Sequence, residues 1–243
     1  MQVFTYAERP DLSDRVDEVA DPWPEFIHHA DVTQLHWAKL RAELPDFQLV
    51  LYDDEQNVVV GRGQTVPASA RNGLPDGVDD VLDRRFGAGS GEEPDVLCAL
   101  VAIVDAGRRG EGLSAAIIDG MRRAAAAAGL AELIAPVRPT WKERYPLIPL
   151  ERYAHWRRGD GLPFDPWIRL HARLGAELVE VCPESMRVTG TVAEWEEWTG
   201  LSFPEEGEYV VPGALVPVRF EEGIGVYVEP NVWMRHPVDR RQA

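Results

Sequence analysis

The chain has 243 residues, of which 45% are hydrophobic and 27% charged, and this composition is that of a globular protein and not of a disordered one. Its 41 acidic residues against 25 basic ones give a formal net charge of −16, and a field of that sign repels nucleic-acid phosphates. No apolar run approaches the length of a membrane span, and the first residues lack the basic and apolar regions of a secretory leader. We therefore expect a cytoplasmic protein without a nucleic-acid or membrane partner, and the charge weakly favours a cationic or neutral substrate.

The pattern of apolar and turn-forming residues predicts strands alternating with helices. Strands are expected at 3–7, 47–54, 57–68, 96–104, 131–137 and 177–181, with strand-like pieces at 208–220 and 223–236. Helices are expected at 31–44, 78–86, 113–128, 165–175 and 191–200. The strand at 96–104 is apolar on both faces and should be central in the sheet. No repeat or linker divides the chain, so we predict one α/β domain, with an insertion at about 139–163 and an elaborated C-terminal part from about 190.

Two helix starts carry specific capping signals. Asp165 precedes Pro166, which suits an N-cap followed by the first helical position, and Thr191 with Glu194 forms a capping-box sequence. The two cysteines, Cys98 and Cys182, lie in apolar strand-like stretches. We expect them to be buried free thiols and not a disulfide.

The residues from Val104 to Ser114, VDAGRRGEGLS, join the central strand to the next helix. The first N–H groups of a helix have no internal partners and the helix dipole is positive there, so such a turn can bind an anion. Glycine lets phosphate oxygens approach the main chain, and Arg108 and Arg109 can add charge-assisted hydrogen bonds. The alternative is a tight turn with solvated arginines. The turn lacks the Gly-Lys-Ser/Thr of a P-loop and the third glycine of a dinucleotide-binding fingerprint.

The stretch RGEGLS, residues 109–114, resembles the (Q/R)xxGx(G/A) signature of the GCN5-related N-acetyltransferases (GNATs), with serine at the last position. Residues 165–181, DPWIRLHARLGAELVEV, are similar to the late helix and strand of the same family. The resemblance implies a mixed, largely antiparallel twisted sheet flanked by helices, with a splay between its fourth and fifth strands. It also implies an N-acyltransferase that passes the acyl group of acetyl-CoA, or of another acyl-CoA, directly to a small-molecule amine or a peptide. No metal is expected.

By this resemblance the CoA pyrophosphate binds the turn and the pantetheine arm lies along the preceding strand, where a main-chain N–H could stabilise the oxyanion. The resemblance also allows a homodimer. The residues expected to contact CoA are Ile103, Val104, Arg108, Arg109, Gly110, Glu111, Gly112, Leu113 and Ser114.

A tyrosine that protonates the leaving CoA thiolate is common in the family, four residues before the glycine that ends the late helix. Here this position is His171, before Gly175, and we predict it as the catalytic acid, a role that needs a raised pKa or a relay water. The alternative is a structural core histidine, because His171 shares a helix face with Trp167 and Leu174. The general base is unassigned: Asp95 is the nearest carboxylate, but an offset of one residue turns a strand side chain to the other face.

The insertion at 139–163 alternates aromatic and basic residues and follows the fifth strand, on the family's substrate side. Trp141, Tyr145 and Trp156 are predicted to contact the acceptor or a longer acyl chain. The alternative is a surface subdomain that packs its aromatic rings inward. The identity of the acceptor stays open, as do two other functions: a non-catalytic acyl-CoA-binding or regulatory module, and a phosphate-binding α/β enzyme of another family.

Overall fold

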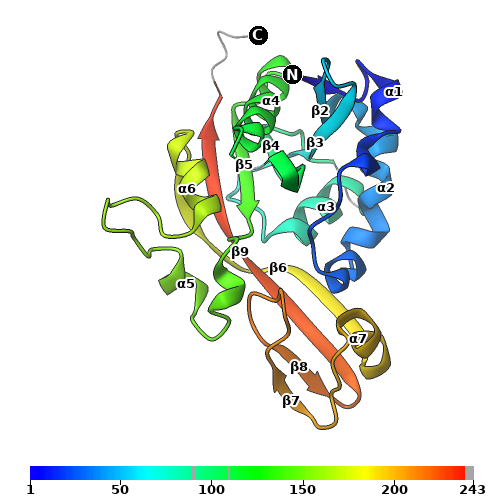
Figure 1. The fold of residues 1–243 in the computed structure, drawn as a ribbon, viewed down its shortest axis with the longest axis vertical. Coiled ribbons are helices and arrows are strands. Elements are labelled where there is room, and N and C mark those ends of the chain that lie inside the picture. Colours follow the sequence, from blue (N-terminus) through cyan, green and yellow to red (C-terminus); the bar gives the residue numbers. More distant parts are fainter. Residues whose placement is uncertain (89–90, 109, 239–243) are drawn as a thin grey trace.

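The computed structural model describes residues 1–88, 91–108 and 110–238 (Figure 1). In these residues a nine-stranded sheet has the order β1-β2-β3-β4-β5-β9-β8-β7, and β6 pairs with β9. The strands are β1 (Gln2–Thr5), β2 (Gln48–Asp53), β3 (Val58–Ala68), β4 (Val96–Val104), β5 (Glu132–Val137), β6 (Glu177–Thr191), β7 (Gly207–Tyr209), β8 (Val218–Glu221) and β9 (Ile224–Pro237). Strands β4 and β5 run parallel and the other pairs are antiparallel, which confirms the predicted mixed sheet with a central β4.

Helices cover both faces of the N-terminal half of this sheet (Figure 1). The helices are α1 (Pro10–Ser13), α2 (Thr33–Glu43), α3 (Val78–Phe86), α4 (Leu113–Ala127), α5 (Leu150–Tyr153), α6 (Pro166–Arg173) and α7 (Val192–Thr199), with 3₁₀ turns at Val16–Glu18, Glu25–His29, Pro45–Phe47, Ala106–Arg108 and Lys142–Arg144. Successive side chains of a strand point to opposite faces. Leu49 and Leu51 therefore pack into the core beneath α4, and Val50 and Tyr52 into the core beneath α2 and α3.

Both predicted caps are confirmed. The Asp165 carboxylate accepts the main-chain N–H groups of Trp167 and Ile168 at the start of α6, and Thr191 and Glu194 form a reciprocal capping box at the start of α7. The two cysteines are buried free thiols as expected. No helix in the described ranges is long and apolar enough to cross a membrane.

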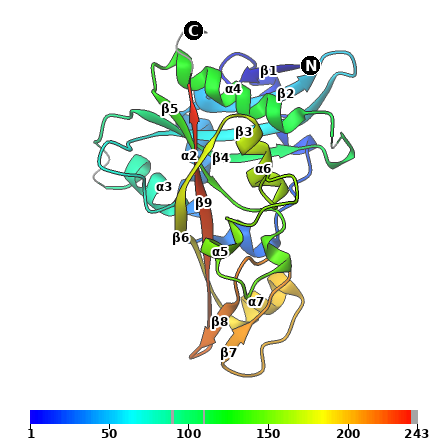
Figure 2. The same cartoon turned by 90° about the vertical axis from the view of Figure 1, so that its left-hand side faces the viewer.

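The C-terminal third differs from the expected elements, because β6 and β9 form one long ladder. The sequence predicted a strand ending at Val181 and a separate strand-like piece at 223–236, which contains Pro230. Pro230 lies where the ladder shifts register, between the pairs Cys182–Asn231 and Met186–Glu229, and a proline without an N–H is tolerated at such an irregularity. The far ends of β6 and β9 carry α7, β7 and β8 as an extension of the sheet (Figure 2).

Candidate active site

A cavity of about 840 Å³ opens where β4 and β5 separate. The parallel pairing of the two strands ends at Cys98 and Ile134. Beyond that point, residues 99–104 of β4 and residues 135–138 after the last shared pair both line the cavity. The predicted splay is therefore present, and it leaves main-chain groups of β4 without a β5 partner.

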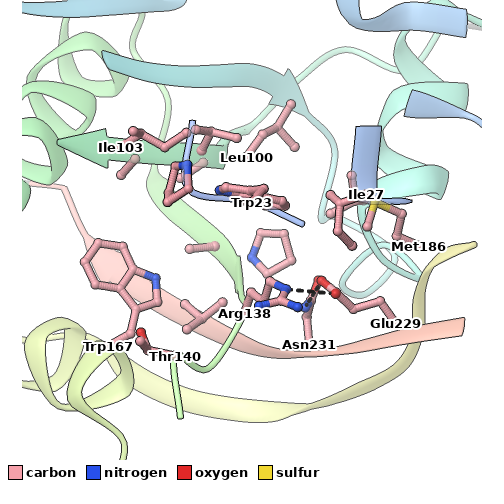
Figure 3. A pocket seen from close by; sticks show the side chains of 18 of the residues that line it. Trp23, Ile27, Leu100, Ile103, Arg138, Thr140, Trp167, Met186, Glu229 and Asn231 are labelled. Carbon is pink, nitrogen blue, oxygen red and sulfur yellow. Dashed lines mark hydrogen bonds and ion pairs between the residues drawn. The ribbon is translucent and has the colours of Figure 1, made fainter. Parts of the chain in front are cut away.

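Strand β4 also contains a bulge at the start of the splay. On β3, Gln64 pairs with Val101 and Thr65 with Ala99, so Leu100 is an extra residue in β4. A bulge bends its strand and disrupts the local ladder. Leu100 itself lines the cavity (Figure 3). The apolar run that predicted the strand carried no signal for this bulge.

The turn before α4 has the geometry of an anion site. Gly110 and Gly112 have φ angles of +94° and +79°, a conformation that disfavours side chains, and nothing lies within 4 Å of a Cβ built on either residue. Gly112 is the N-cap of α4 and no side chain caps the helix. The adjoining Ile103, Val104 and Ser114 line the cavity. Uncapped N–H groups beside open space fit the phosphates of a CoA molecule.

The other residues predicted to contact CoA are placed differently. The Arg108 guanidinium pairs with Asp53, at 2.7 Å from Oδ2, and with Glu111, at 2.9 Å from Oε2. These pairs tie the turn to β2, and a phosphate would have to displace them to reach Arg108 or approach Glu111. Leu113 is buried in the core beneath α4, so only its main chain could bind a ligand. Arg109 lies outside the described residues.

His171 lines the cavity but is not poised as an acid. Only 3% of its surface is exposed, and its Nδ1 lies 2.8 Å from Nε2 of His236. Burial lowers the pKa of His171 to about 3, with a further contribution from His236. The imidazole is therefore neutral near pH 7, and the raised pKa that the predicted acid role needs is absent. Its Nε2 is buried and has no hydrogen-bond partner among the described residues, so a route through a relay water is the form of the prediction that remains.

The aromatic residues of the insertion mostly pack against one another. Tyr145 and Trp156 meet edge to face with centroids 5.1 Å apart, and Tyr153 and Phe164 complete the cluster. The predicted contacts of Tyr145 and Trp156 with substrate are not supported, because neither residue is among those that line the cavity. Trp141 does line it, as predicted for a substrate contact.

A buried polar network occupies the end of the cavity away from α4. Arg138 donates from Nε to Oε2 of Glu229 at 2.8 Å, and from Nη2 to the carbonyl of Gly213. Tyr227 donates its hydroxyl to the same Glu229 oxygen at 3.0 Å, and the Asn231 amide donates to Oε1 at 3.3 Å. Figure 3 shows Arg138 and Glu229 facing each other beneath Trp23, whose ring centroid lies 6.0 Å from the guanidinium carbon.

Reasoning from sequence missed this network, although one signal could have found it. Glu229 is a single carboxylate inside the apolar stretch VYVEPNVW of β9, and a charge at such a position is rarely buried without a partner. Its partner, Arg138, follows β5 in the chain and is 91 residues away. No spacing rule joins two residues that far apart.

An N-terminal wall, residues 21–37, closes the side of the cavity opposite β9. Trp23, Ile27 and Trp37 of this wall line the cavity. Asp21 is held by Arg62 of β3 through an ion pair of 2.7 Å. The wall thus has a fixed position against the sheet.

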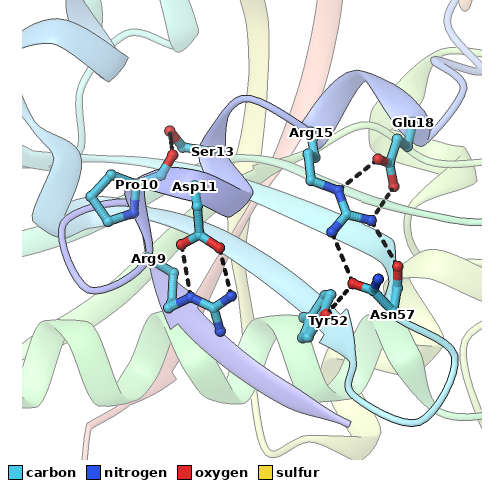
Figure 4. A network of polar contacts seen from close by, with 8 residues as sticks. All are labelled: Arg9, Pro10, Asp11, Ser13, Arg15, Glu18, Tyr52 and Asn57. Atoms are coloured by element: carbon cyan, nitrogen blue, oxygen red, sulfur yellow. Dashed lines mark hydrogen bonds and ion pairs between the residues drawn. The ribbon is translucent and has the colours of Figure 1, made fainter.

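The segment that precedes the wall is anchored to the β2–β3 hairpin (Figure 4). Arg15 pairs with Glu18 at 2.7 Å and donates to the main-chain carbonyl of Asn57 at 2.8 Å. The hydroxyl of Tyr52 donates to the Asn57 side chain at 2.5 Å. These contacts fix residues 9–18, from which the wall continues.

Comparison with known proteins gives two kinds of likeness. No family model matches the chain. The chain is 33% identical over 270 residues to the arginine N-acetyltransferase avaD of Aspergillus versicolor, which covers 96% of this chain and 93% of that protein. Among solved structures, it resembles the loading GNATL domain of CurA from Lyngbya majuscula, with a TM-score of 0.60, 14% identity and coverage of 98% and 97%.

A second similar structure is the GphF GNAT-like decarboxylase in complex with isobutyryl-CoA, with a TM-score of 0.59, 18% identity and coverage of 98% and 100%. At these identities the solved structures establish the fold alone. The alignments span nearly the whole chain, so the N-terminal wall and the C-terminal extension are parts of what is shared.

Proposed function

Because this chain belongs to the GCN5-related N-acetyltransferase superfamily and is an acetyl-CoA-dependent N-acetyltransferase, we propose that its acceptor is arginine. The observation that carries the proposal is the full-length likeness to an arginine N-acetyltransferase. The net charge of −16 supports it, since a negative field attracts a guanidinium cation. Asp21 and Glu143 add carboxylates, and Trp23 and Trp141 add aromatic faces, to the lining of the cavity.

The two substrates would approach from the two ends of the cavity. At the end nearest α4, the N–H groups after Gly112 would hold the CoA pyrophosphate, and Ile103 and Val104 would flank the pantetheine arm. The thioester would then lie in the splay beside residues 99–104. Arginine would enter the other end, between the N-terminal wall and β9.

The chemical step is attack of an unprotonated arginine nitrogen on the thioester carbonyl. A main-chain N–H of the unpaired part of β4 would stabilise the oxyanion, and holding both substrates in one cavity supplies much of the remaining rate enhancement. When the tetrahedral intermediate collapses, the C–S bond breaks, and the proton that the attacking nitrogen loses balances the proton that the CoA thiolate takes up. A water held by the neutral His171 could deliver this proton.

An amine panel with acetyl-CoA tests the proposed acceptor. Release of free CoA thiol is followed with L-arginine, L-lysine, a polyamine, an aminoglycoside and a short peptide, and mass spectrometry identifies the acetylated product. We expect the highest kcat/KM with L-arginine. A higher value with any other amine of the panel, or thiol release without acetylarginine, would show that arginine is not the acceptor.

A further inference from the structure

We propose that Arg138 binds the carboxylate of the acceptor, so that the enzyme selects a free amino acid over its amide or its decarboxylated analogue. The inference deepens the proposed function and rests on it for the presence of an amine acceptor in this cavity. It does not depend on which amino acid that acceptor is.

Arg138 keeps hydrogen-bond donors that no described residue uses. A guanidinium has five N–H donors in a planar fork. One bonds to Glu229 and one to the carbonyl of Gly213, so three have no partner among the described residues. Arg138 lines the cavity, and none of its nitrogens is both buried and unpaired. The unpaired Nη1, with its two N–H groups, is therefore open to a ligand in the cavity.

Glu229, in contrast, has little capacity left for a cation. Its Oε2 already accepts from Arg138 and Tyr227, and its Oε1 accepts from Asn231. Only 1% of the Glu229 surface is exposed. The network as a whole thus presents donors to the cavity, which suits a carboxylate and not an ammonium or guanidinium group.

The loop that contains Gly213 fixes the orientation of the Arg138 guanidinium. Gly213 lies against Pro24 of the N-terminal wall, where a Cβ on the glycine would come within 2.5 Å of the proline ring. The same loop is held by Lys142, which donates to the carbonyl of Leu215. A guanidinium held in one orientation loses little entropy when it binds a planar carboxylate.

The other arginines that line the cavity are less suited to this role. Arg62 is paired with Asp21 at 2.7 Å and with Asp17 at 3.5 Å. Arg144 is exposed and lies over the Trp141 ring. In a protein with a net charge of −16, the carboxylate of a substrate needs a cation at its binding site. Arg138 is half-buried, and three of its five N–H donors have no partner among the described residues.

The test on the wild-type enzyme compares L-arginine with L-argininamide and agmatine. The amide keeps the size and shape of the acceptor and lowers the pKa of its α-amine, so it should react at least as well if the carboxylate is not recognised. We expect kcat/KM to fall about tenfold or more for both analogues, the weight of one charge-assisted hydrogen bond. Equal or better turnover of argininamide would overturn the proposal.

Variants assign the effect to Arg138. Arg138→Lys keeps the charge and loses the fork, and the double variant Arg138→Met with Glu229→Gln avoids a buried unpaired carboxylate. We expect the KM for arginine to rise about tenfold or more in both, with the KM for argininamide and the Kd for CoA unchanged. Arg219→Met, which removes an exposed cation paired with Glu221 outside the cavity, is the matched control and should keep the preference for arginine. Retained discrimination in Arg138→Lys and in the double variant would contradict the assignment.

The same measurements separate this inference from the choice of arginine as acceptor. If the best acceptor is another amino acid and its amide is rejected, arginine is wrong and the role of Arg138 stands. If arginine and argininamide are acetylated equally well, arginine stands and the carboxylate contact is wrong.

Discussion

The two ends of the cavity are built in different ways. Beside the α4 end lies one turn of the chain whose main-chain N–H groups have no side-chain cap, with Gly110 and Gly112 in left-handed conformations. The end beside β9 is made of side chains from β9 and from the segment just after β5, joined by the ion pair of Arg138 with Glu229. A site made from one turn is local and tolerates changes elsewhere, whereas a buried network depends on every partner. The two ends should therefore fail in different ways when they are altered.

The largest expected effect of a substitution on stability is at the β9 end. Glu229→Gln leaves the guanidinium of Arg138 without its counter-charge in a site where 17% of the arginine side chain is exposed. Removing one partner of a buried ion pair typically costs about 3 kcal/mol or more. We expect a loss of about that size in the free energy of unfolding from urea titration.

Glu132→Gln provides the control for this variant. It removes an ion pair of 3.2 Å with Arg235 whose side chains are 38% and 36% exposed, and pairs at that exposure contribute about 0–1 kcal/mol. Equal losses in the two variants would mean that the network is no more important to the fold than a surface pair.

This contrast explains which part of the site could be predicted from sequence. The shape of the turn before α4 could be predicted, because a tight turn into a helix needs a local pattern of glycines, and Gly110 and Gly112 do have positive φ angles; phosphate binding there stays a prediction. The ion pair of Arg138 with Glu229 could not be predicted, because the two residues come together only when β5 and β9 pair in the sheet. Tyr145 and Trp156 were predicted to contact substrate because the insertion is rich in aromatic residues. Composition does not distinguish rings that pack on one another from rings that line a cavity.

The elements of the fold that could be predicted are likewise those whose signal lies in one continuous stretch of sequence. Strand β4 and helix α3 have the predicted bounds, since β4 is a continuous apolar run and α3 has its apolar residues at helical spacing. The second half of β6, residues 182–191, had no such signal: it contains Pro183 and is polar, and it is a strand because β9 supplies its partner. The bulge at Leu100 likewise comes from pairing with β3.

The stability of the fold should depend on pH through two buried histidines, His171 and His236. Burial lowers the pKa of His171 to about 3 and that of His236 to about 4, against about 6.5 in the unfolded chain. Between pH 6.5 and 4 the unfolded chain therefore binds more protons than the folded one. Stability should fall as the pH falls, by about 1.4 kcal/mol per pH unit for each imidazole.

Urea titrations between pH 7.5 and 4.5 check this slope. His171→Phe should reduce this slope by about 1.4 kcal/mol per pH unit, the contribution of one imidazole. His155→Phe, which removes an exposed histidine, should leave the slope unchanged. Carboxylates contribute equally to all three proteins and cancel in the comparison. Identical slopes in the wild type and His171→Phe would mean that folding does not lower the pKa of His171.

The CoA end should respond to a change in its turn without a large loss of stability. Gly112→Val places a branched side chain on the face that phosphates would approach, at a φ of +79°. We expect the Kd for CoA, measured by calorimetry, to rise tenfold or more, which corresponds to about 1.4 kcal/mol. Gly129→Val, at a φ of +72° just after the other end of α4, carries the same strain with no neighbour within 4 Å and should leave the Kd unchanged. A similar loss in both variants would indicate backbone strain and not a lost phosphate contact.

The smallest expected effect is on turnover at His171, and it decides how far the family's acid chemistry applies to this chain. A neutral imidazole with a pKa near 3 cannot act as an imidazolium acid at pH 7, so its help is limited to holding a water. We expect His171→Phe to change kcat by less than about tenfold and to keep the pH profile of the wild type, below the 10²–10⁴-fold weight of a full acid–base group. His171→Tyr, which introduces the phenol common in the family, separates the alternatives. If His171→Phe loses 10²-fold or more and one ionisation, and His171→Tyr restores part of the rate, the acid role predicted from sequence is correct and the bound substrates must raise the pKa of the imidazole.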